Sequence, residues 1–396
     1  MKSLKIFLFF FFSFLFFPIF LRAQEPPLIT VSPEGYAKRV VKIIPFSGDK
    51  GAEVSNLVKR ALNLHLIILA LEERAPSTKD PTLTGMVSQS EGRYLFEGQL
   101  TDPISEKVFN LRAEATNQVL LASAIADKVV ELLTKYQGIS LSKVVFVRRT
   151  ARMDELIITD FLKQDFRRLR TAELILFPKF SPSGKKVAYI VYEKGSYRLE
   201  VANVQGLERR EYRIKGIAGP PVWLPDEEQL ILTLEERGEV GLFLFDLKKG
   251  ELSKLHTGLG VRQAGSVSLD GSLVAFVASL RDKPQVYLLN LRSGEARRVS
   301  FEGGQATSPR FSPKRNLLVY LLFQTTLVIY DLSNNKKTQL ALPFTITDPS
   351  FSPTGDYLIF RAKGKKGGIY ILHLDSRSFQ SYLPYDNLYY PDWGRY

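Results

Sequence analysis

Cysteine and histidine, two residue types that often carry chemistry, are absent or rare in this chain. Its 396 residues include no cysteine and three histidines, His65, His256 and His373, which lie far apart in the sequence. Without cysteine the chain has no disulfide, no thiolate metal site and no cysteine nucleophile. An isolated histidine is more often a core or surface residue than a metal ligand. We therefore expect no metal site and no cofactor.

The motifs of hydrolases and nucleotide-binding enzymes are absent as well. The chain has no G-x-S-x-G turn, which exposes a catalytic serine, and no glycine-rich loop that cradles phosphates. No two carboxylates stand at a spacing that marks them as an acid and base pair. Asp226, Asp270 and Asp356 are better explained as turn residues, because aspartate accepts hydrogen bonds from the backbone of tight turns. These features predict a protein that is not an enzyme.

A short phrase recurs through the second half of the chain. Its clearest copies read Pro-x-Phe-Ser-Pro followed by Ser-Gly or Thr-Gly, at 178–184 and 349–355. We call the aromatic or apolar residue in the middle of each copy the anchor. The anchors are Phe180, Trp223, Val267, Phe311, Phe351 and Trp393, spaced 43, 44, 44, 40 and 42 residues apart. This spacing is typical of β-propeller blades, which repeat every 40–50 residues or so.

The strands around the anchors predict how the ring closes. Each of the first five anchors is followed by a turn, two apolar strands and a short, often basic strand, such as 296–299. Trp393 has no strands after it, while residues 143–169 hold three strands with no phrase before them. Joining these two pieces completes a sixth blade and removes the free edges of an open sheet. The sequence therefore predicts a six-bladed β-propeller over 143–396, closed by its C-terminal strand.

Residues 38–140 lack the phrase and show strands alternating with helices. A strand is expected over 40–46, a helix over 54–62 and a hairpin around Asp102 and Pro103. A longer amphipathic helix is expected over 117–136, with Gly138 placed where a helix stops. The predicted fold class is therefore mainly β, with a small α/β domain before the propeller.

The first 23 residues have the order of a secretory signal peptide. Lys2 and Lys5 precede a run of roughly sixteen apolar residues, which is shorter than the ~20 of a membrane span. We expect cleavage near Ala23 or Gln24, and an uncleaved N-terminal anchor is the alternative. The rest of the chain has no other segment of membrane length, so we expect an exported, soluble protein.

Residues 24–37 form an N-terminal segment that is expected to be flexible. Its three prolines exclude a helix, but Leu28, Ile29, Thr30 and Val31 form a β-prone tetrad. The segment is either a disordered leader or an extended peptide that adds a strand to the sheet of a partner. The sequence alone leaves both alternatives open.

The chain is also basic. Its formal charge is +13, and removal of Lys2, Lys5 and Arg22 with the signal lowers this charge to +10. Such a surface attracts nucleic acid, anionic lipid or an acidic protein. Because an exported chain rarely meets nucleic acid, peripheral association with the envelope or with an acidic protein partner is the expectation. Charge that is merely solvated is the alternative.

Together these features resemble the TolB family over nearly the whole mature chain. The resemblance rests on the passage from helix to propeller, on the Ser-Pro-x-Gly turns, and on the order of an exported α/β domain followed by a propeller. The segments that carry it are 124–129, 133–134, 138–139, 144–147, 154–160, 301–305 and 391–393.

The resemblance implies a periplasmic, monomeric component of the Tol-Pal system, which links the inner and outer membranes and supports envelope integrity during cell division. In that family the propeller mouth binds the peptidoglycan-associated lipoprotein Pal, and the N-terminal segment communicates with the inner-membrane protein TolA. By position, the N-terminal contact comprises Leu28, Ile29, Thr30 and Val31. By position, the mouth comprises Ile217, Arg262, Gln263, Gln305, Thr307, Thr347, Asp348 and Tyr389.

Two other functions are compatible with the sequence. Propellers also precede peptidase domains, so a non-catalytic propeller related to those is one of them. The other is an exported propeller that binds sugar or glycan in its central funnel, where Tyr389 and Tyr390 suit stacking on a sugar ring. The same tyrosines suit a protein-binding hot spot, where tyrosine is enriched.

Overall fold

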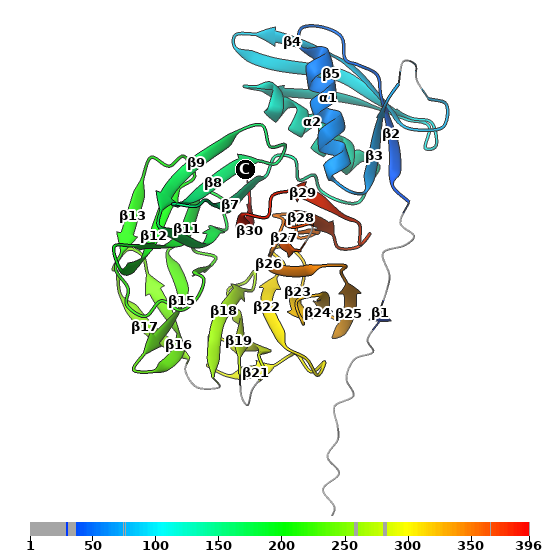
Figure 1. Cartoon of the computed structure of the whole chain (residues 1–396). Coiled ribbons are helices and arrows are strands. Elements are labelled where there is room, and N and C mark those ends of the chain that lie inside the picture. Colours follow the sequence, from blue (N-terminus) through cyan, green and yellow to red (C-terminus); the bar gives the residue numbers. More distant parts are fainter. Residues whose placement is uncertain are drawn as a thin grey trace, which may run out of the picture.

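The computed structural model describes residues 29–30, 37–73, 75, 77–256, 260–279, 283–364 and 366–395. These residues form a ring of sheets with a smaller domain packed against one side of it (Figure 1). The expected signal peptide at 1–23 and most of segment 24–37 lie outside the described residues. No helix in the described ranges is long and apolar enough to cross a membrane.

The smaller domain is a five-stranded sheet covered by two helices. Its strand order is β3-β2-β4-β5-β6, with β3 and β4 parallel to β2 and the remaining pairs antiparallel. Val54 and Val58 of α1 and Ile125 and Val129 of α2 belong to its core. The elements are β2 (Arg39–Ile43), α1 (Gly51–Leu64), β3 (Ile68–Glu72), β4 (Thr82–Ser90), β5 (Arg93–Asp102), β6 (Lys107–Ala115) and α2 (Gln118–Leu133).

Helix α2 is shorter than the sequence predicts. The Asn117 Oδ1 atom accepts a hydrogen bond from the Leu120 backbone N at 2.9 Å, which caps the start of the helix. The helix ends at Leu133, where Thr134 turns to extended backbone and its hydroxyl donates to the Val130 carbonyl at 2.7 Å. The prediction that the helix reaches 136 is therefore wrong.

Gly138 belongs to the linker between the domains and does not end α2, so that part of the prediction is also wrong. The Asp127 carboxylate of α2 accepts hydrogen bonds from the backbone N of Ser140 at 2.7 Å and of Leu141 at 3.2 Å. A Cβ atom at Gly138 would lie 2.3 Å from the Asp127 side chain. Only glycine lets the linker approach the helix this closely.

The propeller contains six antiparallel sheets arranged around an axis (Figure 1), so the predicted architecture is confirmed. Blades 1 to 3 are β10 (Leu174–Phe180) to β13 (Arg209–Tyr212), β14 (Val222–Trp223) to β17 (Leu252–His256), and β18 (Val261–Val267) to β21 (Ala296–Arg298). The second and third strands of these blades are β11 (Lys186–Glu193) and β12 (Ser196–Asn203), β15 (Gln229–Glu236) and β16 (Glu239–Asp246), and β19 (Leu273–Ala278) and β20 (Gln285–Asn290).

Blades 4 and 5 continue the same order, and blade 6 combines strands from the two ends of the propeller. Blade 4 is β22 (Ala306–Phe311), β23 (Leu317–Leu322), β24 (Thr326–Asp331) and β25 (Lys336–Ala341). Blade 5 is β26 (Thr345–Phe351), β27 (Tyr357–Lys363), β28 (Gly368–His373) and β29 (Phe379–Leu383). Blade 6 is β30 (Leu388–Gly394), β7 (Lys143–Arg149), β8 (Asp154–Asp160) and β9 (Phe166–Ala172).

The C-terminal strand closes the ring, as the sequence predicts. Strand β30 pairs antiparallel with β7, which places Trp393 opposite Val144. The Trp393 ring is buried, stacks on Phe161 at 5.5 Å and donates a hydrogen bond from Nε1 to the Ser142 hydroxyl at 2.7 Å. The last strand therefore joins the ring to the linker from the smaller domain.

The turns after the anchors have the conformation that their residues suggest. Gly184 has a φ of +75° and its N donates to the Ser181 carbonyl at 2.8 Å. Asp226 and Asp270 accept backbone hydrogen bonds within their own turns, as predicted. Asp356 is different, because its carboxylate accepts from the Arg315 guanidinium of the neighbouring blade at 3.4 Å.

The smaller domain packs against the end of the ring where these turns lie. The Tyr357 hydroxyl of blade 5 donates to the His65 carbonyl at 2.8 Å, and the Tyr136 hydroxyl donates to Asp375 at 3.0 Å. The side chains of His65 and His373 are both fully buried here. Burial lowers the pKa of His373 to about 4. These two histidines are core residues of the interface, and the side chain of His256 lies outside the described residues.

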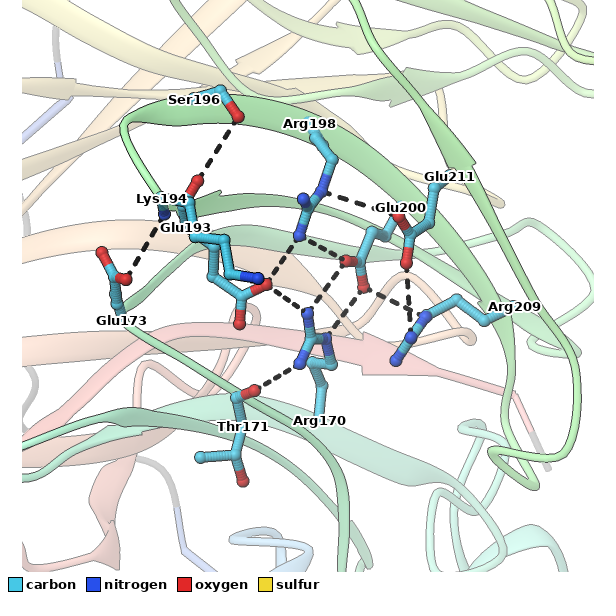
Figure 2. A network of polar contacts seen from close by, with 10 residues as sticks. All are labelled: Arg170, Thr171, Glu173, Glu193, Lys194, Ser196, Arg198, Glu200, Arg209 and Glu211. Carbon is cyan, nitrogen blue, oxygen red and sulfur yellow. Dashed lines mark hydrogen bonds and ion pairs between the residues drawn. The ribbon is translucent and has the colours of Figure 1, made fainter.

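Blades 6 and 1 are joined by a network of charged side chains (Figure 2). Arg170 of β9 donates to Glu193 at 2.8 Å and to Glu200 at 3.2 Å, both in blade 1. Arg198 and Arg209 pair with Glu200 as well, at 3.9 and 3.5 Å. Figure 2 shows the three guanidinium groups converging on Glu200, whose side chain is 0% exposed.

Candidate functional site

The end of the ring opposite the smaller domain is the candidate site, and we call it the mouth. It is the end where the chain enters the first strand of each blade, and the first strands contact one another around the axis. Backbone hydrogen bonds tie these entering loops to the turns between the second and third strands. Examples run from Phe323 N to the Gln305 carbonyl at 3.1 Å and from Glu235 N to the Gly216 carbonyl at 2.7 Å. The loops and turns therefore form one framework.

Four of the six first strands have a β-bulge at the same position near the mouth. The pairing of β10, β22, β26 and β30 with their neighbours shifts register at the same position in each blade. One residue of each bulge has left-handed backbone, with φ between 53° and 55°. These residues are Phe177, Ser308, Asp348 and Tyr390, each three residues before its anchor. Such conformations cost free energy in residues other than glycine and gather at functional sites, where bulges re-aim side chains.

Tyr389 is the most firmly held side chain of the mouth. The guanidinium carbons of Arg149 and Arg361 each lie 4.2 Å from the centre of its ring. Arg361 is itself fixed, because its Nε donates to the Leu388 carbonyl at 2.9 Å. Arg149 pairs with Asp154 at 3.3 Å. Tyr389 is therefore a half-buried aromatic ring, positioned by two cations before any partner arrives.

Thr347 and Asp348 lie beside this tyrosine. Thr347 is opposite Arg361 in the pairing of β26 with β27. Its Oγ1 is buried and has no hydrogen-bond partner among the described residues. The negative charge of Asp348 acts on Tyr390, whose pKa is raised mainly by burial. Thr347, Asp348 and Tyr389 thus form one polar and aromatic cluster.

The other predicted mouth residues contribute unequally. Gln305 is exposed, while Gln263 and Thr307 are half-buried. Ile217 bridges to Leu234 and packs against the core between blades 1 and 2, so its side chain has a structural role. Arg262 lies in β18, and its side chain is outside the described residues.

Positive charge is concentrated on the propeller. Residues 143–396 contain 38 lysines and arginines against 27 aspartates and glutamates, whereas 38–140 contain 13 against 12. The turns between second and third strands lie at the mouth, and in five blades they carry exposed cations within the described residues. These are Arg152, Lys194, Arg237, Lys283, Lys363 and Lys366. A surface of this kind attracts an acidic partner.

Part of the N-terminal tetrad forms a strand. Ile29–Thr30, β1, pairs in parallel with β25 of blade 4, with Ile29 opposite Thr338 and Thr30 opposite Gln339. Leu28 and Val31 lie outside the described residues. The backbone at 29–30 is therefore extended and adds to the outer edge of a blade.

Two important mouth residues are missed by reasoning from the sequence. Arg149 and Arg361 belong to second strands of neighbouring blades, at β7 and β27, and no phrase marks them. An arginine inside an otherwise apolar strand is the only signal, because a buried cation needs partners. Among the described residues, no three His, Asp or Glu side chains gather so as to hold a metal ion.

Comparison with known proteins agrees with the propeller fold. The family model described as the TolB beta propeller domain matches residues 130–396. The Protein TolB homolog of Chlorobium luteolum is 28% identical over 197 residues, covering 49% of this chain and 44% of that protein. The Tol-Pal system protein TolB of Francisella tularensis subsp. tularensis is 26% identical over 267 residues, covering 62% of this chain and 61% of that protein. The matched segments thus span only 44% and 61% of these relatives.

The whole fold has a close counterpart among solved structures. The crystal structure of TolB from Acinetobacter baumannii superimposes with a TM-score of 0.82, covering 94% of this chain and 98% of that chain. Sequence identity in this comparison is 20%, so the likeness concerns the fold.

Proposed function

The chain belongs to the TolB family, and on that premise we propose that it is a periplasmic scaffold of the Tol-Pal system. Its propeller mouth docks a lipoprotein like Pal, and its N-terminal segment couples to an inner-membrane protein like TolA. In this role it is not an enzyme, and it supports outer-membrane integrity and cell division.

The observation that carries the proposal is the preorganised ring of Tyr389. Two guanidinium groups hold it 4.2 Å from their carbon atoms, so little side-chain entropy is lost when a partner packs on it. Tyrosine and arginine are also the residues most enriched in binding hot spots. The excess of cations over the propeller as a whole supports an acidic protein as the partner.

Protein docking is favoured over the binding of sugar. A sugar ring would have to stack on an aromatic face, but the Tyr389 ring already contacts Arg149 and Arg361. This leaves less aromatic surface for a carbohydrate than an unaccompanied tyrosine offers.

The pairing of Ile29–Thr30 with β25 supports the coupling role. It favours the extended peptide over the disordered leader, because a segment that adds a strand to its own blade is suited to add one to a partner sheet.

Tyr389→Ala is expected to weaken lipoprotein binding at least tenfold, about 1.4 kcal/mol, because it removes the central aromatic ring. Isothermal titration with the soluble domain of the Pal-like lipoprotein from the same organism measures the change. Leu207→Ala is the control, since Leu207 is 85% exposed in a turn at the other end of the ring. Equal affinity of the Tyr389→Ala variant and the wild type, with both correctly folded, would contradict docking at the mouth.

A further inference from the structure

A second opening lies at the end of the ring opposite the mouth, and we call it the funnel. It has a cavity volume of about 240 Å³. All six anchors line its wall. Because the anchors are equivalent in the repeat, the residues beside them form rings as well. The residue before each anchor forms the floor, and the residue two positions after it forms the rim.

The floor of the funnel contains two cations with different surroundings. The floor residues are Lys179, Val222, Ser266, Arg310, Ser350 and Asp392. The Lys179 ammonium donates to the Asp392 carboxylate at 2.7 Å, and the Ser350 hydroxyl donates to the same carboxylate at 2.8 Å. The positive charge of Lys179 is therefore balanced by the carboxylate of Asp392 in the neighbouring blade.

Arg310 makes no ion pair with a described residue, and the charges of Asp392 and Asp348 act on it only from beyond ion-pair distance. Arg310 is only 9% exposed. Its Nε donates to the Pro349 carbonyl at 2.9 Å, and its Nη1 donates to the carbonyls of Gly265 and Pro309 at 2.6 and 3.1 Å. No carboxylate within the described ranges lies within ion-pair distance of it, and its Nη2 donates to no described residue.

A buried cation without a directly paired anion is costly, because burial removes its hydration and more distant carboxylates offset only part of that loss. Burial lowers the pKa of Arg310, and the charges of Asp392 and Asp348 oppose this shift only in part. An anion that enters the funnel and contacts the free edge of the guanidinium would recover a charge-assisted hydrogen bond. The floor therefore selects for a negative group.

The wall and rim select for an apolar body attached to that group. The wall consists of the anchors, five of which are aromatic. The rim is proline in four blades, Leu269 in a fifth and Arg395 in the sixth. Leu269 is 64% exposed, which leaves an apolar side chain available at the entrance. Pockets for drug-sized ligands have volumes of roughly 300–1,000 Å³. This smaller, open funnel suits the end of a chain.

We propose that the funnel binds the C-terminal residue of a peptide whose last side chain is apolar, with its carboxylate on the Arg310 guanidinium. The apolar side chain packs against the anchors, and the preceding residues leave across the rim. Capture of a chain end by its carboxylate is a recurring mode of peptide recognition. The funnel lies at the other end of the ring from Tyr389, so this binding is independent of lipoprotein docking at the mouth.

The chain carries a reporter for this site. It has two tryptophans, Trp223 and Trp393, and both line the funnel. Titration with acetyl-Gly-Leu as the free acid is expected to change tryptophan fluorescence and saturate. The same peptide as its C-terminal amide is expected to bind at least tenfold more weakly, because it lacks the charge that Arg310 recognises. Acetate and inorganic phosphate at matched ionic strength should neither saturate the signal nor displace the peptide.

Two variants test separately how the funnel binds the carboxylate and the apolar side chain of the peptide. Arg310→Gln should abolish the preference for the acid over the amide. Leu269→Asp, on the exposed rim, should weaken binding of the acid at least fivefold, while the matched Leu207→Asp variant, outside the funnel, should not. Equal binding of acid and amide, or unchanged binding in Leu269→Asp, would overturn the proposal. Displacement by phosphate alone would also overturn it. If Arg310→Gln does not fold, the comparison of acid with amide and the Leu269→Asp variant still test the proposal.

Discussion

Removal of residues 390–396 is expected to lower the melting temperature by at least about 10 °C, because it takes away most of β30 and the buried Trp393. Without this strand β7 becomes a free edge, and the ring loses the contact that joins its two ends. The hydrogen bond from Trp393 to Ser142 and the stacking on Phe161 are lost at the same time.

A single substitution should reproduce much of this loss. Trp393→Ala is expected to cost about 3–5 kcal/mol, as for other buried tryptophans. For a domain of this size each kcal/mol corresponds to roughly 2–4 °C. Thermal unfolding followed by circular dichroism measures both variants. Tyr385→Ala is the control, because Tyr385 is 60% exposed in the loop before β30. A truncated chain that melts within two degrees or so of the wild type would contradict closure by this strand.

Arg170→Met is the second change with a large expected effect, a loss of about 3 kcal/mol in the free energy of unfolding. Arg170 connects β9 to blade 1 through Glu193 and the fully buried Glu200 (Figure 2). Replacing Arg170 removes the shortest of the three ion pairs of the buried Glu200, which leaves this charge only its longer contacts with Arg198 and Arg209. Although burial opposes ionisation of Glu193, hydrogen bonds from Arg170 and Arg198 lower its pKa overall. The stabilisation from this glutamate is therefore lost as the pH falls through its folded pKa.

The same strand supplies a matched control for Arg170. Arg168 is 62% exposed and pairs with Glu155 at 3.0 Å, so Arg168→Met should cost no more than about 1 kcal/mol. Urea unfolding of the two variants gives the comparison. Replacing both charges, in Arg170→Met with Glu200→Leu, should recover part of the loss, because no buried charge is then left alone on that contact. Equal stability of the Arg170→Met and Arg168→Met variants would show that the network does not join the blades.

The blades and their closure could be predicted because each depends on a repeated local pattern. An anchor followed by a turn specifies the same strand order every time, and the unmatched copy at Trp393 could pair only with the unmatched strands at 143–169. Strand β3 could not be predicted in this way. It follows α1 after three residues, with no glycine or proline between them, and the chain reverses at Leu66 with a φ of +64°.

The candidate site was predictable only in part, because some of its contacts join different blades. Position in the repeat indicates which residues enter the first strands, and so it gives Thr347, Asp348 and Tyr389. It does not indicate which of them point into the core, as Ile217 does. The two arginines that hold Tyr389 come from second strands in different blades. Contacts between blades depend on the twist and packing of the whole ring, which a pattern within one blade does not contain.

Site-specific crosslinking in living cells tests the central claim most directly. A photoreactive amino acid at Gln305, which is exposed at the mouth, is compared with one at Leu207, exposed at the opposite end. We expect the probe at 305 to capture a Pal-like lipoprotein, identified by mass spectrometry, and we expect capture to fall at least tenfold when Tyr389→Ala is added. The probe at 207 should not capture it. Capture of the lipoprotein from 207 and not from 305 would contradict docking at the mouth.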